Sequence, residues 1–150
     1  MRSIASRFAL LALLAYLIAG CASSKLTFEP PLTTETEMIT VMVSKVEHKR
    51  GRLRVWLRMK NKTEQTLQMS YGDFVAKVGD AEHAGVLRVF VKSIKDFDMR
   101  PGLDKKFNGP MEFDGVPKDA AGVKVVVKNI RVMGQQGSHT IQFDVPMQKQ

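Results

Sequence analysis

Residues 52–60 alternate strictly between apolar and polar side chains, and this pattern constrains the fold more than any other in the chain. One face of the segment carries the apolar side chains Leu53, Val55, Leu57 and Met59. The other face carries Arg52, Arg54, Trp56, Arg58 and Lys60. A period of two residues is typical of a β-strand with one buried face. We therefore predict a strand here, with one face in the core and one in solvent.

Further strands are predicted wherever β-branched and aromatic residues lie between turn residues. A strand within 105–113 would be bulged or at an edge, because Pro110 cannot donate to a ladder. Single helical turns are considered at 93–99 and 118–121. The predicted strands are 38–46, 52–60, 66–69, 74–78, 86–93, 105–113, 123–133 and 139–145. Short strands at this spacing favour an all-β fold, an immunoglobulin-like antiparallel β-sandwich of about seven strands.

The first twenty residues differ from the rest of the chain. Two arginines and no acidic residue precede an apolar run at 8–19. This run has the length of the apolar region of a signal peptide and is shorter than the roughly 20 residues of a membrane span. We expect residues 1–20 to be a signal peptide.

The run ends in Ile18-Ala19-Gly20-Cys21, and Cys21 is the single cysteine of the chain. This junction resembles the bacterial lipobox. The resemblance implies that Cys21 receives a diacylglyceryl group, that the signal peptide is cleaved before it, and that its new amino group is acylated with a fatty acid such as palmitate. Two or more acyl chains hold a protein stably on a bilayer. The alternatives are a secreted protein with a chance cysteine and a transmembrane anchor.

The position after Cys21 bears on the destination of such a lipoprotein. In enterobacterial lipoproteins an Asp at this position signals retention in the inner membrane, and this chain has Ala22. The resemblance therefore implies the outer membrane, facing the periplasm. Residues 21–36 contain Pro30-Pro31 and no periodicity, so we expect an acylated cysteine with a flexible tether, followed by a β-sandwich domain over 37–150.

Several segments of the body carry a second resemblance. They are residues 59–63, which contain Asn61, residues 71–74, Met99-Arg100-Pro101-Gly102, and residues 111–117. Together they resemble the small immunoglobulin-like domains of unknown function found on many secreted bacterial lipoproteins. Asn61 suits a left-handed or side-chain-capped turn, and Gly102 suits the positive φ of a type II turn. The resemblance implies a fold and no catalytic residues.

The polar face of residues 52–60 is the best candidate for a contact surface. We call Arg52, Arg54, Trp56, Arg58 and Lys60 the basic stripe. Arginine favours phosphate and carboxylate partners, and Trp suits membrane surfaces, so an envelope protein or anionic lipid could bind here. The alternative is a solvated face neutralised by acids on neighbouring strands, with Trp56 covered by arginine stems. Nucleic acid is not expected outside the cytoplasm, although the net charge is +8.

Other chemistries find less support. Methionine and histidine side chains suit Cu(I), so the methionines together with His48, His83 and His139 could belong to a copper carrier. They form no tight cluster in the sequence, and filling of the core is the better account of the methionines. Asp96, Asp98 and Asp104 lie in a segment of mixed charge without a nucleophile motif. We expect no catalytic residues, no metal site and no cofactor. The predicted function is a membrane-anchored, non-enzymatic binding or assembly module of the envelope, with a periplasmic small-ligand or copper carrier as the alternative.

Overall fold

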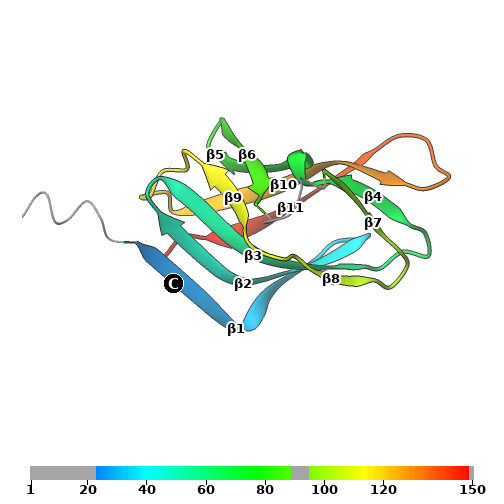
Figure 1. Ribbon diagram of the computed structural model, residues 1–150, viewed down its shortest axis with the longest axis horizontal. Helices are drawn as coiled ribbons and strands as arrows, with labels where there is room; N and C mark the ends of the chain where they lie inside the picture. Colours follow the sequence, from blue (N-terminus) through cyan, green and yellow to red (C-terminus); the bar gives the residue numbers. More distant parts are fainter. Residues whose placement is uncertain (1–22, 89–94, 149–150) are drawn as a thin grey trace, which may run out of the picture.

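The structure is a computed structural model that describes residues 23–88 and 95–148 (Figure 1). Every strand pair in these residues is antiparallel, so the predicted all-β class is confirmed. There are eleven strands rather than about seven. They are β1 (Ser24–Glu35), β2 (Ile39–Lys49), β3 (Arg52–Asn61), β4 (Leu67–Ser70), β5 (Phe74–Val78), β6 (Ala81–Leu87), β7 (Asp96–Met99), β8 (Asp104–Lys106), β9 (Met111–Asp114), β10 (Gly122–Val132) and β11 (His139–Pro146).

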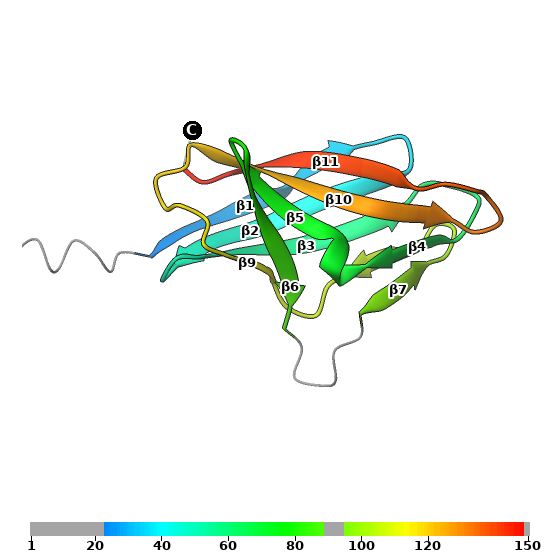
Figure 2. The ribbon, with the colours of Figure 1, turned by 90° about the horizontal axis from the view of Figure 1, so that it is seen from above.

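The strands form one continuous ladder in the order β1-β2-β3-β9-β6-β5-β10-β4-β7, with β11 beside β10 and β8 beside β3. The ladder folds over a single core, so that β1, β2 and β3 lie in one layer and β5, β10 and β11 in the other (Figures 1 and 2). Strand β6 joins the layers, because residues 85–87 pair with β9 and residues 81–84 pair with β5. A 3₁₀ turn, η2 (Tyr71–Asp73), leads into β5.

Strand β3 confirms the alternation on which the prediction rested. Leu53, Val55 and Met59 are completely buried, and Leu57 is nearly so. The strand follows a two-residue loop in which Arg50 has a φ of 53° and Gly51 a φ of 72°. A loop with both values positive is a type I′ turn, whose twist matches that of the flanking strands.

Strand β1 differs from the flexible tether predicted over residues 21–36. Residues 24–27 and 32–35 pair with β2 in two stretches, and the register shifts between Thr27 and Leu32. Pro30 and Pro31 lie in this interruption, where their missing amide hydrogens remove no bond of the ladder. The folded domain therefore begins at Ser24 rather than at residue 37, and Leu26 is part of the core.

Four smaller predictions also change. The proposed helical turn at 93–99 is strand β7 from Asp96 onward, with Phe97 and Met99 buried in a two-residue period. Residues 118–119 form a turn rather than a helix. The predicted strand 105–113 is divided into β8 and β9, with Pro110 between them. The predicted strand at 86–93 begins earlier, at Ala81, and its last residues lie outside the described part of the chain.

Both predicted turns are confirmed by their geometry. Gly102 has a φ of 67°, and the amide of Leu103 donates to the carbonyl of Arg100 across the turn. Asn61 takes the side-chain-capped form, because its Oδ1 accepts from the amide of Thr63. No helix within the described residues is long and apolar enough to cross a membrane.

Candidate functional site

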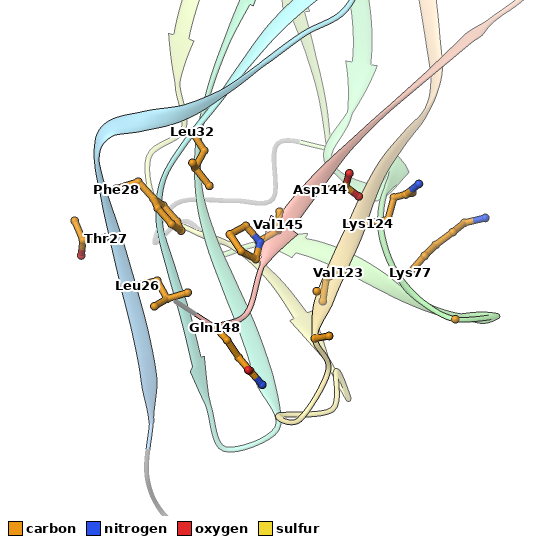
Figure 3. Close-up of a pocket in the computed structure, with 14 residues that line it drawn as sticks. Leu26, Thr27, Phe28, Leu32, Lys77, Val123, Lys124, Asp144, Val145 and Gln148 are labelled. Carbon is orange, nitrogen blue, oxygen red and sulfur yellow. The ribbon is translucent and has the colours of Figure 1, made fainter. Parts of the chain in front are cut away.

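A groove lies between β1 and the adjacent ends of β10 and β11, with a volume of about 910 Å³ (Figure 3). Its wall is partly apolar and comes from both layers of the fold. The apolar lining residues are Leu26, Phe28, Leu32, Val123, Val145 and Pro146. Leu32 keeps 38% of its surface exposed, so the groove presents an uncovered apolar side chain to solvent.

The groove is bordered by two strand edges. Among the described strands, β1 pairs only with β2 and β11 pairs only with β10. The interruption between Thr27 and Leu32 takes the middle of β1 out of register with β2, and Phe28 lies in this interruption at the wall of the groove. The groove therefore combines an apolar wall with polypeptide edges that can accept a further strand.

Charged side chains lie at the rim. Lys124 of β10 stands opposite Lys77 of β5 and opposite Asp144 of β11. Lys77 forms an ion pair with Glu82 at 2.8 Å. Within residues 23–88 and 95–148, Lys124 forms no ion pair, so its ammonium group is available to a ligand in the groove.

The basic stripe lies on the outer face of β3, as the alternation predicted. Lys45 of β2 places its Nζ 3.9 Å from the ring centroid of Trp56, which is a cation–π contact. The cation beside the Trp56 ring thus comes from a lysine of a neighbouring strand, whereas the alternative for the stripe has Trp56 covered by arginine stems.

Acids from β8 and β9 meet three of the four cations of the stripe. Arg52 donates to Asp114, and Arg54 Nε donates to Glu112 Oε1 at 3.0 Å. Arg58 holds Asp104 with two hydrogen bonds of 2.6 and 2.7 Å. The structure therefore favours the alternative of a solvated face neutralised by neighbouring acids, and only Lys60 has no ion pair among the described residues.

Glu112 is the centre of this network. Its side chain is 8% exposed, and it also lies 2.9 Å from Arg88 Nε. The hydrogen bond from Arg52 lowers the pKa of Asp114 below its ordinary value, and the same bond raises the pKa of Arg52. The arginines of the stripe are thereby held in fixed positions, while part of each side chain stays exposed.

A second basic feature lies at the tip of the β2–β3 hairpin. Lys49, Arg50, Arg52 and Arg54 line a cleft of about 330 Å³. The run Lys49-Arg50 in the predicted turn was the sequence signal for this cleft, but only the type I′ turn brings Lys49 opposite Arg52.

The potential copper ligands are dispersed. Met59, Met99 and Met111 are completely buried in the core. His48 donates from Nε2 to the carbonyl of Val116 at 2.7 Å. Among the described residues, no three His, Cys, Asp or Glu side chains are placed to share a metal ion. Met59, Met99 and Met111 therefore act as core residues, whereas Met133 is 50% exposed.

The predicted signal peptide, residues 1–20, and Cys21 lie outside the described residues. The groove was not predicted, because β1 had been assigned to a tether. The apolar residues Leu26, Phe28 and Leu32 within that segment were the signal that could have revealed it.

Comparison with known proteins shows likeness at the level of the fold. No protein-family model matches the chain. No curated protein matches it either. A predicted lipoprotein of Bacillus subtilis superimposes with a TM-score of 0.51 at 12% identity, over 76% of this chain. The chain spans 38% of the length of that protein.

A protein of unknown function from Listeria monocytogenes superimposes with a TM-score of 0.50, also at 12% identity. The match covers 85% of this chain and 88% of the Listeria protein. At such low identity both likenesses show a shared all-β fold and carry no activity over to this chain.

Proposed function

We propose that this chain is a lipid-anchored envelope module, with an immunoglobulin-like domain, that holds an extended segment of another envelope protein. The observation that carries the proposal is the groove between β1 and β11, which is apolar and is bordered by two strand edges. In this proposal the contact lies at the edges of the sheet rather than at the basic stripe.

The two borders of the groove favour an extended polypeptide. Strand edges bind a further strand through main-chain hydrogen bonds, while pockets for alternate side chains give specificity. Here Phe28 and Leu32 supply the accessible apolar surface of the groove. A segment with apolar residues at every second position would cover the exposed surface of Leu32.

The rim favours acidic residues in the bound segment. Lys124 is exposed and has no ion pair within the described residues, and Lys77 shares its carboxylate partner, Glu82, with Lys128. A carboxylate on the bound segment would complement the ammonium group of Lys124. Such a rim charge contributes mainly to the association rate and to specificity.

The envelope location rests on the sequence Ile18-Ala19-Gly20-Cys21, and it agrees with the description of the Bacillus neighbour as a lipoprotein. The absence of Asp after Cys21 favours the outer membrane, facing the periplasm. To test the anchor, Cys21→Ser should move the protein from the membrane fraction to the soluble fraction and abolish incorporation of labelled palmitate. Retention in the membrane without a lipid would contradict it.

The groove is tested with extended peptides selected from a random display library against the purified full chain. Bound peptides should protect main-chain amides of β1 and β11 from hydrogen exchange. Leu32→Arg should weaken their binding by about tenfold or more, because it places a charge in the apolar wall. The control is Val86→Arg, since Val86 is 48% exposed on β6 and lies outside the groove lining.

Two results would contradict this function. One is selected peptides that bind Leu32→Arg as tightly as the unchanged protein. The other is a groove that binds a fluorescent fatty acid but no extended peptide, which would support the small-ligand carrier instead.

A further inference from the structure

We infer that the tip of the β2–β3 hairpin faces the membrane and binds the phosphate groups of anionic lipid headgroups. The inference rests on the lipid anchor at Cys21 in the proposed function. It concerns a surface other than the groove, formed by Lys25, Lys49, Arg50, Arg52 and Arg54, which we call the basic end.

The anchor lies close in the sequence to the basic end. Strand β1 begins at Ser24, which pairs with His48 near the end of β2. The hairpin turns two residues later, at Arg50-Gly51, and Figure 1 shows the start of β1 beside this turn. Cys21 precedes Ser24 by three residues, which span at most about 10 Å. Acyl chains on Cys21 would therefore hold the basic end close to the bilayer.

The orientation of the anchored domain depends on β1 being a strand. A tether over residues 22–36 could have lifted the domain by about 50 Å and left its orientation free. Pairing from Ser24 onward removes that freedom. The anchored end of the domain is then fixed by the register of β1 with β2.

The basic end carries positive charge that is open to solvent. Lys25, Lys49 and Arg50 are exposed and form no ion pair within the described residues. Arg52 and Arg54 are held by Asp114 and Glu112, yet about a third of each side chain stays exposed, 30% and 34%. A guanidinium group that is held by a carboxylate on one side and exposed to solvent on the other can donate to a phosphate without losing further conformational freedom.

Acidic groups at the same end offset part of this charge. Glu47 pairs with Lys45, and Asp114 pairs with Arg52. Asp119, in the loop after β9, is accompanied by Lys118. These acids have basic neighbours of their own, so the charges of Lys25, Lys49 and Arg50 remain as the excess that an anionic surface can neutralise.

The backbone of Arg50 has a conformation that is unusual for arginine. Its φ of 53° is a conformation that Asn, Asp or Gly adopts more readily in a type I′ turn. An arginine at this position is therefore not explained by the turn itself. A cation at the tip of the hairpin is explained by contact with an anionic surface.

The far end of the molecule provides a contrast. The loop between β10 and β11, residues 133–138, contains no charged residue. It lies at the opposite end of the domain from the start of β1 (Figure 1). The asymmetry between these two loops gives the anchored domain a preferred side toward anionic lipid.

The test uses the lipidated full chain in two kinds of vesicle, phosphatidylcholine alone and phosphatidylcholine with phosphatidylglycerol. The labelling rate of Lys49 by a water-soluble amine reagent is compared with that of Lys106, an exposed lysine on β8. We expect Lys49 to react at least about threefold more slowly in the anionic vesicles, because each cation near such a surface strengthens the attraction by about fivefold. Lys106 should react equally in both.

Arg50→Asn is the informative variant, because asparagine keeps the type I′ turn while removing the charge. It should reduce the protection of Lys49, whereas Lys60→Gln, which removes an exposed cation elsewhere on β3, should not. Raising the salt to about 0.5 M should also remove the protection, since it shortens the screening length to a few ångströms.

The outcomes separate this inference from the proposed anchor. A chain that does not float with either vesicle would refute the anchor. A chain that floats with both, but whose Lys49 reacts at the same rate in both, would overturn the membrane-facing basic end and leave the anchor intact.

Discussion

The side-chain amide of Asn61 lies 2.8 Å from the carbonyl oxygen of Met99, and both residues are completely buried. The same amide donates to the carbonyl of Gln65 at 2.8 Å, while Oδ1 accepts from the amide and the hydroxyl of Thr63. One side chain thus joins the end of β3, the turn that follows it and the end of β7. No apolar residue of similar size could satisfy these groups.

Asn61→Ala should lower the free energy of unfolding by about 3 kcal/mol, because it leaves buried backbone groups without partners. Urea denaturation of the purified protein measures this change. Asn108→Ala is the control, since Asn108 is exposed, and we expect a change within about 0.5 kcal/mol. Equal effects of the two substitutions would show that the Asn61 network does not stabilise the fold.

Gly85→Ala should destabilise the protein by about 2 kcal/mol through crowding. A Cβ atom at this position would lie 2.8 Å from the ring of Phe113 and 2.8 Å from the carbonyl oxygen of Phe74. Thermal unfolding measures the loss. Gly122→Ala serves as the matched control, because its Cβ would meet only Val145 O at the ordinary distance of 3.7 Å. If both variants have the same melting temperature, β6 does not pack as closely as the structure indicates.

Glu112→Gln should destabilise the domain by about 2 kcal/mol, because three arginines lose the carboxylate that they share. The expected loss of stability is smaller than that for a fully buried ion pair, because Arg52 and Arg54 are partly exposed. Chemical denaturation at low salt measures the effect. Glu35→Gln breaks the exposed pair with Lys62 and should change the stability much less than Glu112→Gln does. An effect of Glu112→Gln as small as that of the control would contradict the role of Glu112.

Acid should unfold the protein partly through Glu82. Hydrogen bonds from Lys128 and then Lys77 lower its pKa from the ordinary 4.5 to about 2. A lowered pKa in the folded state means that the stabilisation is present above about pH 4.5 and is lost as the pH falls toward 2. The melting temperature of the unchanged protein should therefore fall more steeply over this interval than that of Glu82→Gln. Parallel curves would show that these bonds do not form in solution.

The sequence predicts strands well where one face is buried and one is solvated. At β3 every second side chain enters the core, so the alternation is visible in the residues themselves. At β7 the pattern Asp96-Phe97-Asp98-Met99 also alternates, but it is only four residues long and resembled a helical turn. Short segments leave the two periods indistinguishable.

Strand β1 could not be predicted in this way. Its outer part is threonine-rich and contains Pro30-Pro31, and most of its residues are exposed. It is a strand because β2 offers an edge, which is a property of the partner and not of the local sequence. The groove follows from that pairing and was therefore missed as well.

The neutralisation of the basic stripe depends on long-range register. Arg52 and Arg54 meet Asp114 and Glu112 because β3 pairs with β9, some sixty residues away. A sequence shows that these acids exist but not which strand lies beside which. The prediction could name acids on neighbouring strands as an alternative, without identifying them.

Strand β6 has a consequence for how the domain comes apart. Since its first half hydrogen-bonds to β5 and its second half to β9, the two layers share a main chain and no hinge separates them. Opening one layer breaks the ladder of the other, so amides in β3 and β10 should become accessible to exchange in a single cooperative event. The two layers should therefore unfold in one transition rather than in two.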